Sequence, residues 1–335
     1  MAGASAPAIQ CLCEGLGCLE KGRKSLFRDS PIPLKRRKHH VEYIISILLS
    51  GISVGGQYAL IAIGYTMVYG ILRLINFAHG DVFMVAGLVG IYLAGSMPLY
   101  IALPLVVVIT AVLAFFIERV AYKPLRQAPR MSVMISAIGV SYLLQNAATY
   151  ITGGQPMTYP NIQSLTHTIN IAGTPTKMVV ILTPILVILL VFVLTMLINR
   201  TKVGMAMRAV SKDFETAQLM GIKINSVISV TFVVGSILAA IGSILFFSNY
   251  TAVTPTIGSM PGLKAFVAAV FGGIGSIPGA VIGAFIIGIC ETIIKGLPPA
   301  WDVSVFSDAF TFALLIVILV FKPTGLFGEK VTDKV

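Results

Sequence analysis

The sequence has few charged residues: they make up 11% of its 335 residues, against about 25% in soluble domains. No charged segment is long enough to form a soluble catalytic domain beside a membrane anchor. Hydrophobic residues account for 56% of the chain, and the mean hydropathy is +0.92. The composition therefore predicts an integral membrane protein with many spans.

Cysteine is scarce as well, with four residues, of which Cys11, Cys13 and Cys18 lie near the N-terminus. No second pair of ligands follows at a suitable spacing, so we predict no metal site. A Gly-x-x-x-x-Gly-Lys-Ser/Thr phosphate loop is absent, and we predict no cofactor. The formal net charge is +11, but the basic residues lie in short segments between apolar runs. This distribution is typical of cytosolic loops and argues against nucleic acid as a partner.

Residues 1–40 differ from the rest of the chain, because they are basic, rich in cysteine and without apolar periodicity. We expect a disordered basic tail over 1–40 and a membrane domain over 41–335. The apolar sequence opens at Val41, and a GUG start codon read internally gives valine. We therefore expect translation of the native protein to begin there. The alternative is a genuine basic arm that helps to orient the chain.

Eight apolar runs follow, and they predict an all-α polytopic membrane protein with eight to ten transmembrane helices. The runs cover 43–72, 82–94, 99–117, 131–151, 178–198, 227–247, 262–294 and 303–321. The first run is longer than a bilayer core of about 30 Å requires, so it must tilt steeply or break, and its glycines offer places to break. The seventh run holds Gly272, Gly273, Gly275 and Pro278, which predict a helix break within the membrane.

The charge of the connecting segments predicts which face of the membrane each one occupies. The segments 118–130 and 200–223 are rich in lysine and arginine, so we expect both on the cytosolic side. The segments 152–177 and 248–261 are almost free of charge, which suits the outer face.

The cytosolic segment 201–226 is longer than a simple turn between two spans requires. Ser211 is a candidate N-cap, with Asp213 and Glu215 in the first turn, where the helix dipole favours acidic residues. Gly221 is placed to end this helix. A single apolar stripe is predicted from the spacing of Phe214, Ala217 and Met220. The pattern indicates a docking helix; the alternative is a helix that lies on the lipid headgroups.

Several segments of the sequence resemble the branched-chain amino acid ABC transporter permeases, and in particular the first of the two permease subunits. The matching segments are 59–71, 75–81, 118–126, 204–221, 262–280 and 323–325. The resemblance extends from about Val41 to the C-terminus. Glu215, Ala217 and Gly221 match the Glu-Ala-Ala…Gly coupling loop of ABC importer permeases, whereas Thr216 departs from the commonest residue.

The resemblance implies an importer in the bacterial inner membrane with two permeases and two separate ABC ATPase subunits, supplied with an amino acid by a periplasmic binding protein. This chain would then form a heterodimer with a second permease, and membrane lipid would surround both. It would not itself be an enzyme. The implied ATPase-coupling residues are Asp213, Phe214, Glu215, Ala217, Met220 and Gly221.

Three other functions can be weighed against this one. Urea and short-chain amide ABC permeases share the same pattern, so the substrate stays open. An ion-coupled secondary carrier would also use broken helices, but it has no ATPase to dock and no need of residues 211–221. An intramembrane enzyme is not supported, because His79 lacks an HExxH partner and no Ser/Lys or paired-Asp set stands out.

Two broken segments, one in each half of the chain, are the best pointer to a translocation path. The candidate path residues are Asn76, His79, Asp81, Lys264, Gly272, Gly273 and Gly275. Polar groups at membrane depth line cavities or pair with one another. The alternative is that Asn76 and Asp81 cap helix ends, that His79 bonds to the backbone, and that Lys264, which with Glu291 flanks the second broken run, extends to the membrane interface.

Overall fold

The computed structural model describes residues 34–126, 128–171, 174–297, 303–322 and 324–328. The chain divides into two compact units, Met1–Ile44 and Ile45–Val335. Most of the first unit, including Cys11, Cys13 and Cys18, lies outside the described residues. The second unit is the helical domain treated below.

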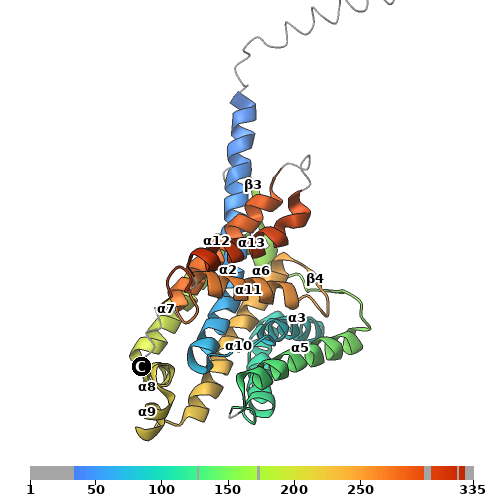
Figure 1. The fold of residues 1–335 in the computed structure, drawn as a ribbon. Helices are drawn as coiled ribbons and strands as arrows, with labels where there is room; N and C mark the ends of the chain where they lie inside the picture. Colours follow the sequence, from blue (N-terminus) through green and yellow to red (C-terminus); the bar gives the residue numbers. More distant parts are fainter. Residues whose placement is uncertain (1–33, 127, 172–173, 298–302, 323, 329–335) are drawn as a thin grey trace, which may run out of the picture. The chain divides into compact units, whose positions relative to one another are not determined.

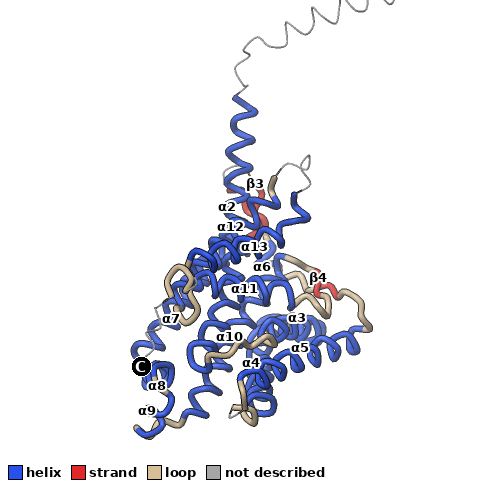
Figure 2. Tube along the Cα trace, viewed as in Figure 1, coloured by secondary structure: helices blue, strands red, loops and turns tan. Residues whose placement is uncertain are grey.

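The described part of the chain is almost entirely helical (Figures 1 and 2). The helices are α2 (Leu34–Leu72), α3 (His79–Ser96), α4 (Leu99–Ile117), the π-helical turn η1 (Glu118–Tyr122), α5 (Arg130–Thr152), α6 (Gln163–Thr166), α7 (Met178–Arg200), α8 (Lys202–Lys212), α9 (Phe214–Leu219), α10 (Ile224–Asn249), α11 (Ser259–Gly272), α12 (Ile277–Lys295), the 3₁₀ turn η3 (Val303–Phe306) and α13 (Ser307–Phe321). Short strands form two antiparallel pairs, β1 (Met157–Thr158) with β4 (Ala252–Val253), and β2 (Thr168–Ile171) with β3 (Thr174–Lys177).

Eight helices in the described residues are long and apolar enough to cross a membrane, and α11 is a shorter apolar helix. This confirms the predicted all-α polytopic class. Helix α4 has the predicted bounds, and α7 begins at the predicted residue, Met178. Apolar runs set these bounds directly, because each must be long enough to span the hydrocarbon core.

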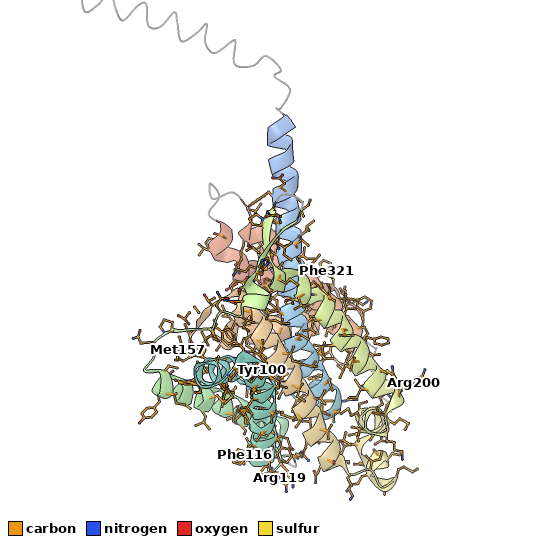
Figure 3. All side chains as sticks on the ribbon, turned by 180° about the vertical axis from the view of Figure 1, so that it is seen from behind. Tyr100, Phe116, Arg119, Met157, Arg200 and Phe321 are labelled. Carbon is orange, nitrogen blue, oxygen red and sulfur yellow. The ribbon has the colours of Figure 1, made fainter. Side chains whose placement is uncertain are left out.

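Helix α10 lies at the centre of the bundle and packs against α3 and α4. Its Phe246 and Phe247 contact Phe83 of α3, with both ring centroids 5.5 Å away. Other helices leave large apolar side chains exposed, such as Phe116 of α4 and Phe321 of α13, which lie on the outside of the molecule (Figure 3). Exposed apolar side chains of this kind suit contact with lipid or with another membrane subunit.

Helix α2 does not break at its glycines, although a break was one of the two predicted ways to fit its length. The glycines instead allow α12 to approach closely. A Cβ atom on Gly55 would lie 2.7 Å from the Cα atom of Phe285 on α12. A residue with a side chain at this position would therefore push the two helices apart.

The predicted break in the seventh apolar run is confirmed, because α11 ends at Gly272 and α12 starts at Ile277. Gly273 and Gly275 between them have φ values of 107° and 97°, which favour glycine. The two helices form a hairpin, and Ser276 caps α12 by accepting a hydrogen bond from the Gly279 N–H. Residues near the C-terminus complete the turn: the N–H groups of Leu326 and Phe327 donate to the carbonyls of Phe271 and Gly272.

Candidate functional site

Asp213 is the N-cap of the short helix α9, and its carboxylate accepts hydrogen bonds from the N–H groups of Glu215 and Thr216 at 3.0 and 3.2 Å. The prediction that Ser211 is the N-cap is therefore wrong. Ser211 belongs to the last turn of α8, where its Oγ donates to the Arg208 carbonyl. The sequence analysis did not predict α8 as a separate helix, so Ser211, which lies in α8, was assigned to the start of α9.

The apolar residues predicted to form one docking stripe on α9 do not share one face. Ala217 is buried against the bundle, whereas Phe214 and Met220 are 42% and 79% exposed. The reason is geometric: a spacing of three residues drifts around a helix of 3.6 residues per turn, and Met220 lies beyond the last helical residue. As a result α9 exposes apolar side chains at both ends, Phe214 at its start and Leu219 and Met220 at its end.

Gly221 ends α9 as predicted, with a φ of 81°. Its N–H donates to the Gln218 carbonyl, and the next N–H, that of Ile222, donates to the Ala217 carbonyl. No atom lies within 4 Å of the position that a Cβ of Gly221 would take. The backbone angle alone therefore favours glycine at this position.

Helix α8 attaches α9 firmly to the membrane helices. It buries Met207 and Val210 and packs against α7 and α10. A Cβ on Gly204 would lie 2.3 Å from the Ile198 carbonyl oxygen, so α8 turns back tightly against the end of α7. Thr201 caps α8 by accepting a hydrogen bond from the Gly204 N–H.

A cavity of about 360 Å³ separates the α8–α9 junction from the end of α2. Its lining includes Arg73, Arg126, Lys212 and Phe214. The connection that follows α2 and both predicted cytosolic segments thus meet at one end of the bundle. Arg126 hydrogen-bonds to Glu118, and burial lowers the pKa of Arg126 even though that carboxylate lies beside it.

Asn76 and Asp81 are buried, and neither caps a helix. The N-cap position of α3 is Ala78, which has no side-chain capping bond. Asn76 accepts a hydrogen bond from the Tyr122 hydroxyl, and Asp81 accepts hydrogen bonds from Ser141 and Gln145 of α5. The capping alternative is therefore wrong: these two side chains bind neighbouring elements, a contact that depends on tertiary packing.

His79 is buried and packs against α2. Its ring lies edge-on to Tyr65, with centroids 5.0 Å apart. Gly64 makes room for the ring, because a Cβ there would lie 2.2 Å from Nε2. Neither His79, Asn76 nor Asp81 lines either of the two cavities described here.

Lys264 is 5% exposed, so its side chain is buried among the helices. Its Nζ lies 2.7 Å from Glu291 Oε1 on α12 and 2.7 Å from Asp308 Oδ1 on α13. The α11–α12 hairpin places Lys264 opposite Glu291, and an ammonium group surrounded by apolar helices requires such partners. Lys264 is therefore held by carboxylates of two other helices, α12 and α13.

Glu291 is the centre of this ion-pair network. Besides Lys264, it accepts hydrogen bonds from the Tyr58 hydroxyl at 3.0 Å and from Lys295 at 2.5 Å. The sequence argument did not include Tyr58, Lys295 or Asp308. The single acidic residue in each of the runs 262–294 and 303–321 is the signal that could have identified Glu291 and Asp308 as partners of Lys264.

A second cavity, of about 430 Å³, opens beside this network. It is lined by Ser50, Val54, Tyr58, Phe246, Tyr250, Thr256, Ile257, Met260, Pro261, Lys264, Glu291, Thr292 and Lys295. Burial raises the pKa of Tyr250, and the nearby Glu291 carboxylate adds to this effect. Phe246 and Tyr250 lie at the end of α10 remote from α9, so the two cavities lie at opposite ends of the bundle.

Several polar side chains of α2 and α10 are buried without a hydrogen-bond partner among the described residues. They are Ser53, Gln57, Thr66 and Ser243. A buried polar group left unpaired costs about 1–3 kcal/mol, so such groups call for a reason. Ser53 and Gln57 adjoin the cavity-lining Val54 and Tyr58 in sequence, which places unpaired polar groups close behind the wall of the second cavity.

Eight helices long enough to span a membrane, a helix break between α11 and α12, and buried ionisable groups that pair with one another are typical of a polytopic membrane transport protein. More specifically, the chain belongs to the family described as "Branched-chain amino acid transport system / permease component", whose model matches residues 47–319.

The chain is similar to individual members of this family over nearly their whole length. It is 39% identical over 307 residues to the high-affinity branched-chain amino acid transport system permease protein LivH of Escherichia coli K12, covering 88% of this chain and 98% of that protein. It is 38% identical over 316 residues to the corresponding protein BraD of Pseudomonas aeruginosa, covering 88% and 99%. A probable branched-chain amino acid transport permease of Methanocaldococcus jannaschii is 28% identical over 297 residues, covering 84% and 92%.

Proposed function

We propose that this chain is the membrane permease subunit of an ABC importer that moves branched-chain or related amino acids into the cytoplasm across the bacterial inner membrane. The observation that carries the proposal is the 38–39% identity, over nearly full length, to proteins named as permeases of high-affinity branched-chain amino acid transport systems. The eight apolar helices are consistent with this role.

In this proposal α9 docks in a groove of a separate ATPase subunit, where ATP is hydrolysed. The docking residues are Asp213, Phe214, Glu215, Ala217, Met220 and Gly221. Two groups of side chains in α8 and α9 support this proposal. Ala217 and Val210 are buried and hold the two helices to the bundle, whereas Phe214 and Met220 expose apolar surface. Exposed apolar side chains on a firmly attached helix can fill pockets on a partner and transmit its movement.

The remaining partners follow from the importer architecture. A second permease would cover part of the apolar surface of α5 or α7, where Leu143 and Phe192 are each 67% exposed, and lipid would cover the rest. A binding protein would deliver the amino acid at the end of the bundle remote from α9.

The translocation path would lie among the broken helices. Asn76, His79 and Asp81 hold the start of α3 to three neighbouring elements, so a change in α3 would alter all three contacts. Gly272, Gly273 and Gly275 form the turn between α11 and α12, where the backbone can approach closely. Lys264 is the path candidate that lines a cavity.

The proposed function can be tested with the complete importer in proteoliposomes. This chain, its second permease, the ATPase and the binding protein are reconstituted, and uptake of radiolabelled leucine, isoleucine and valine is compared with uptake of urea and acetamide. ATP-dependent uptake of the branched-chain amino acids supports the proposal. Uptake of urea or acetamide alone, or uptake driven by an ion gradient without ATP, contradicts it.

A further inference from the structure

The cavity beside Lys264 and Glu291 combines both charges of an amino acid with an apolar wall. We infer that it is a binding site for a zwitterionic aliphatic amino acid on its way through the membrane, an inference that rests on the proposed transport function. The carboxylate of the solute would lie near Lys264 and Lys295, its ammonium group near Glu291, and its side chain against the apolar wall.

The charged groups of the cavity are close together and have opposite sign. Lys264 and Lys295 both donate to the same oxygen of Glu291, Oε1, and Lys264 also pairs with Asp308, so two cations and two carboxylates form one network. Lys264 is 5% and Glu291 2% exposed, and both nevertheless line the cavity. In surroundings of low polarity, charged hydrogen bonds to a solute are stronger than in water.

The network also has hydrogen-bonding capacity to spare. The ammonium group of Lys264 has three N–H donors, and its two carboxylate partners occupy two of them. A carboxylate has about four lone-pair sites, and the hydrogen bonds from Tyr58, Lys264 and Lys295 leave one of them on Glu291. One ammonium and one carboxylate of a solute can therefore bind without first breaking the ion pairs.

The rest of the lining suits an aliphatic side chain. Val54 of α2, Phe246 of α10, and Ile257, Met260 and Pro261 at the start of α11 are all apolar. A volume of about 430 Å³ is within the range of roughly 300–1,000 Å³ usual for small-molecule sites. A site for urea or another small neutral amide would need neither the paired charges nor this apolar wall.

The position of the cavity agrees with delivery from outside. It lies at the end of α10 remote from α9, and the basic segments place α9 on the cytosolic side. Thr256 and Met260 of its lining are exposed, so the cavity is reachable from that end. The lysines and carboxylates of the network already pair with one another, which weakens their attraction for a solute. This suits transport, because a site that binds too tightly would hinder release.

The inference can be tested by protection from thiol labelling. Thr256→Cys is introduced at the exposed rim in full-length protein whose four native cysteines are replaced by serine, and the labelling rate with a charged maleimide is measured in membranes. Three probes are compared: L-leucine, isoamylamine, which lacks the carboxylate, and isocaproate, which lacks the ammonium group. We expect L-leucine to slow labelling severalfold and the other two to have little effect. Equal protection by all three, or none by L-leucine, overturns the inference.

Substitutions separate binding from folding. In the complete importer, Met260→Trp should obstruct the cavity and lower leucine uptake, whereas Leu263→Trp, one turn along the exposed side of α11 and outside the lining, should not. Lys264→Met should lower uptake on the order of tenfold, as expected for loss of a charged hydrogen bond to the solute. Protein amounts in the membrane are measured for each variant.

The outcomes distinguish this inference from the proposed function. Absence of ATP-dependent leucine uptake by the unsubstituted importer contradicts the proposed function itself. Normal wild-type uptake that Met260→Trp and Lys264→Met leave unchanged contradicts only the amino-acid site. Loss of protein from the membrane in Lys264→Met, with no effect of Met260→Trp on uptake, shows that the network serves folding alone and also overturns the inference.

Discussion

Gly288 of α12 lies directly against Gly55 of α2: a Cβ atom on Gly288 would be 2.3 Å from the Gly55 nitrogen. Backbone contact of this kind is typical of membrane helices held together by small residues. It explains why the long first helix carries glycines that do not break it.

This contact predicts a large effect from one methyl group. Gly288→Ala should separate α2 from α12 and destabilise the protein by about 1–3 kcal/mol, the usual cost of overpacking. Gly139→Ala on α5 is the matched control, because no atom lies within 4 Å of its added Cβ. Thermal unfolding of both variants in detergent is the measurement. A Gly288→Ala protein as stable as Gly139→Ala would contradict the close approach.

The backbone of Gly221 gives a second prediction. Gly221→Val should uncouple ATP hydrolysis from uptake, because a β-branched residue resists a φ of 81° and would displace the end of α9. Gly221→Asn should retain most of the coupling, since asparagine tolerates this conformation. Uptake and ATPase activity are measured in the same proteoliposomes. Full coupling in the valine variant would indicate that α9 is a passive connector.

The cap of α9 gives a third prediction. Asp213→Ala removes the acceptor for two backbone N–H groups and should destabilise α9 by about 1 kcal/mol. Faster amide exchange over 214–219 and weaker binding of the ATPase are the expected results. Ser211→Ala, two residues earlier, should change neither, because Ser211 caps no helix. Equal effects of the two substitutions would contradict the assignment of Asp213 as the cap.

The charge of Glu215 supplies a fourth prediction. Glu215→Lys places a positive charge in the first turn of α9, where the helix dipole disfavours it, and on a surface proposed to contact the ATPase. Uptake should fall while the amount of protein in the membrane stays normal. Lys223→Glu, just beyond the helix, serves as a charge-change control. Wild-type uptake in Glu215→Lys would remove this residue from the docking surface.

Asn76 and His79 allow a fifth prediction about the path. Asn76→Ala and His79→Ala should slow uptake per molecule more than they lower the amount of protein in the membrane. Tyr122→Phe is the control for Asn76, because it removes the same hydrogen bond from the other side. If Tyr122→Phe and Asn76→Ala have the same effect, Asn76 serves only to hold α3 in place.

The sequence predicted features that depend on neighbouring residues alone. The apolar length of 99–117 sets α4, and the glycines at 273, 275 and 221 end helices because their own φ angles require it. These features need no knowledge of what packs against them. They account for most of the fold at the level of helices and breaks.

Features that depend on distant contacts were not predictable in this way. Lys264 looks like a residue that extends to the interface until α12 and α13 bring Glu291 and Asp308 beside it. Asp81 looks like a helix cap until α5 brings Ser141 and Gln145 to it. The direction in which a polar side chain points is thus decided by the helix packed against it.

Helix α10 joins the two ends of the molecule without interruption. It begins at Ile224, just after α9, and reaches the second cavity with Phe246 and Tyr250. Its 26 residues span about 39 Å, roughly the thickness of a bilayer with part of its headgroups. Because α10 is one continuous helix, a tilt that begins beside α9 would also displace Phe246 and Tyr250, and with them one wall of the second cavity.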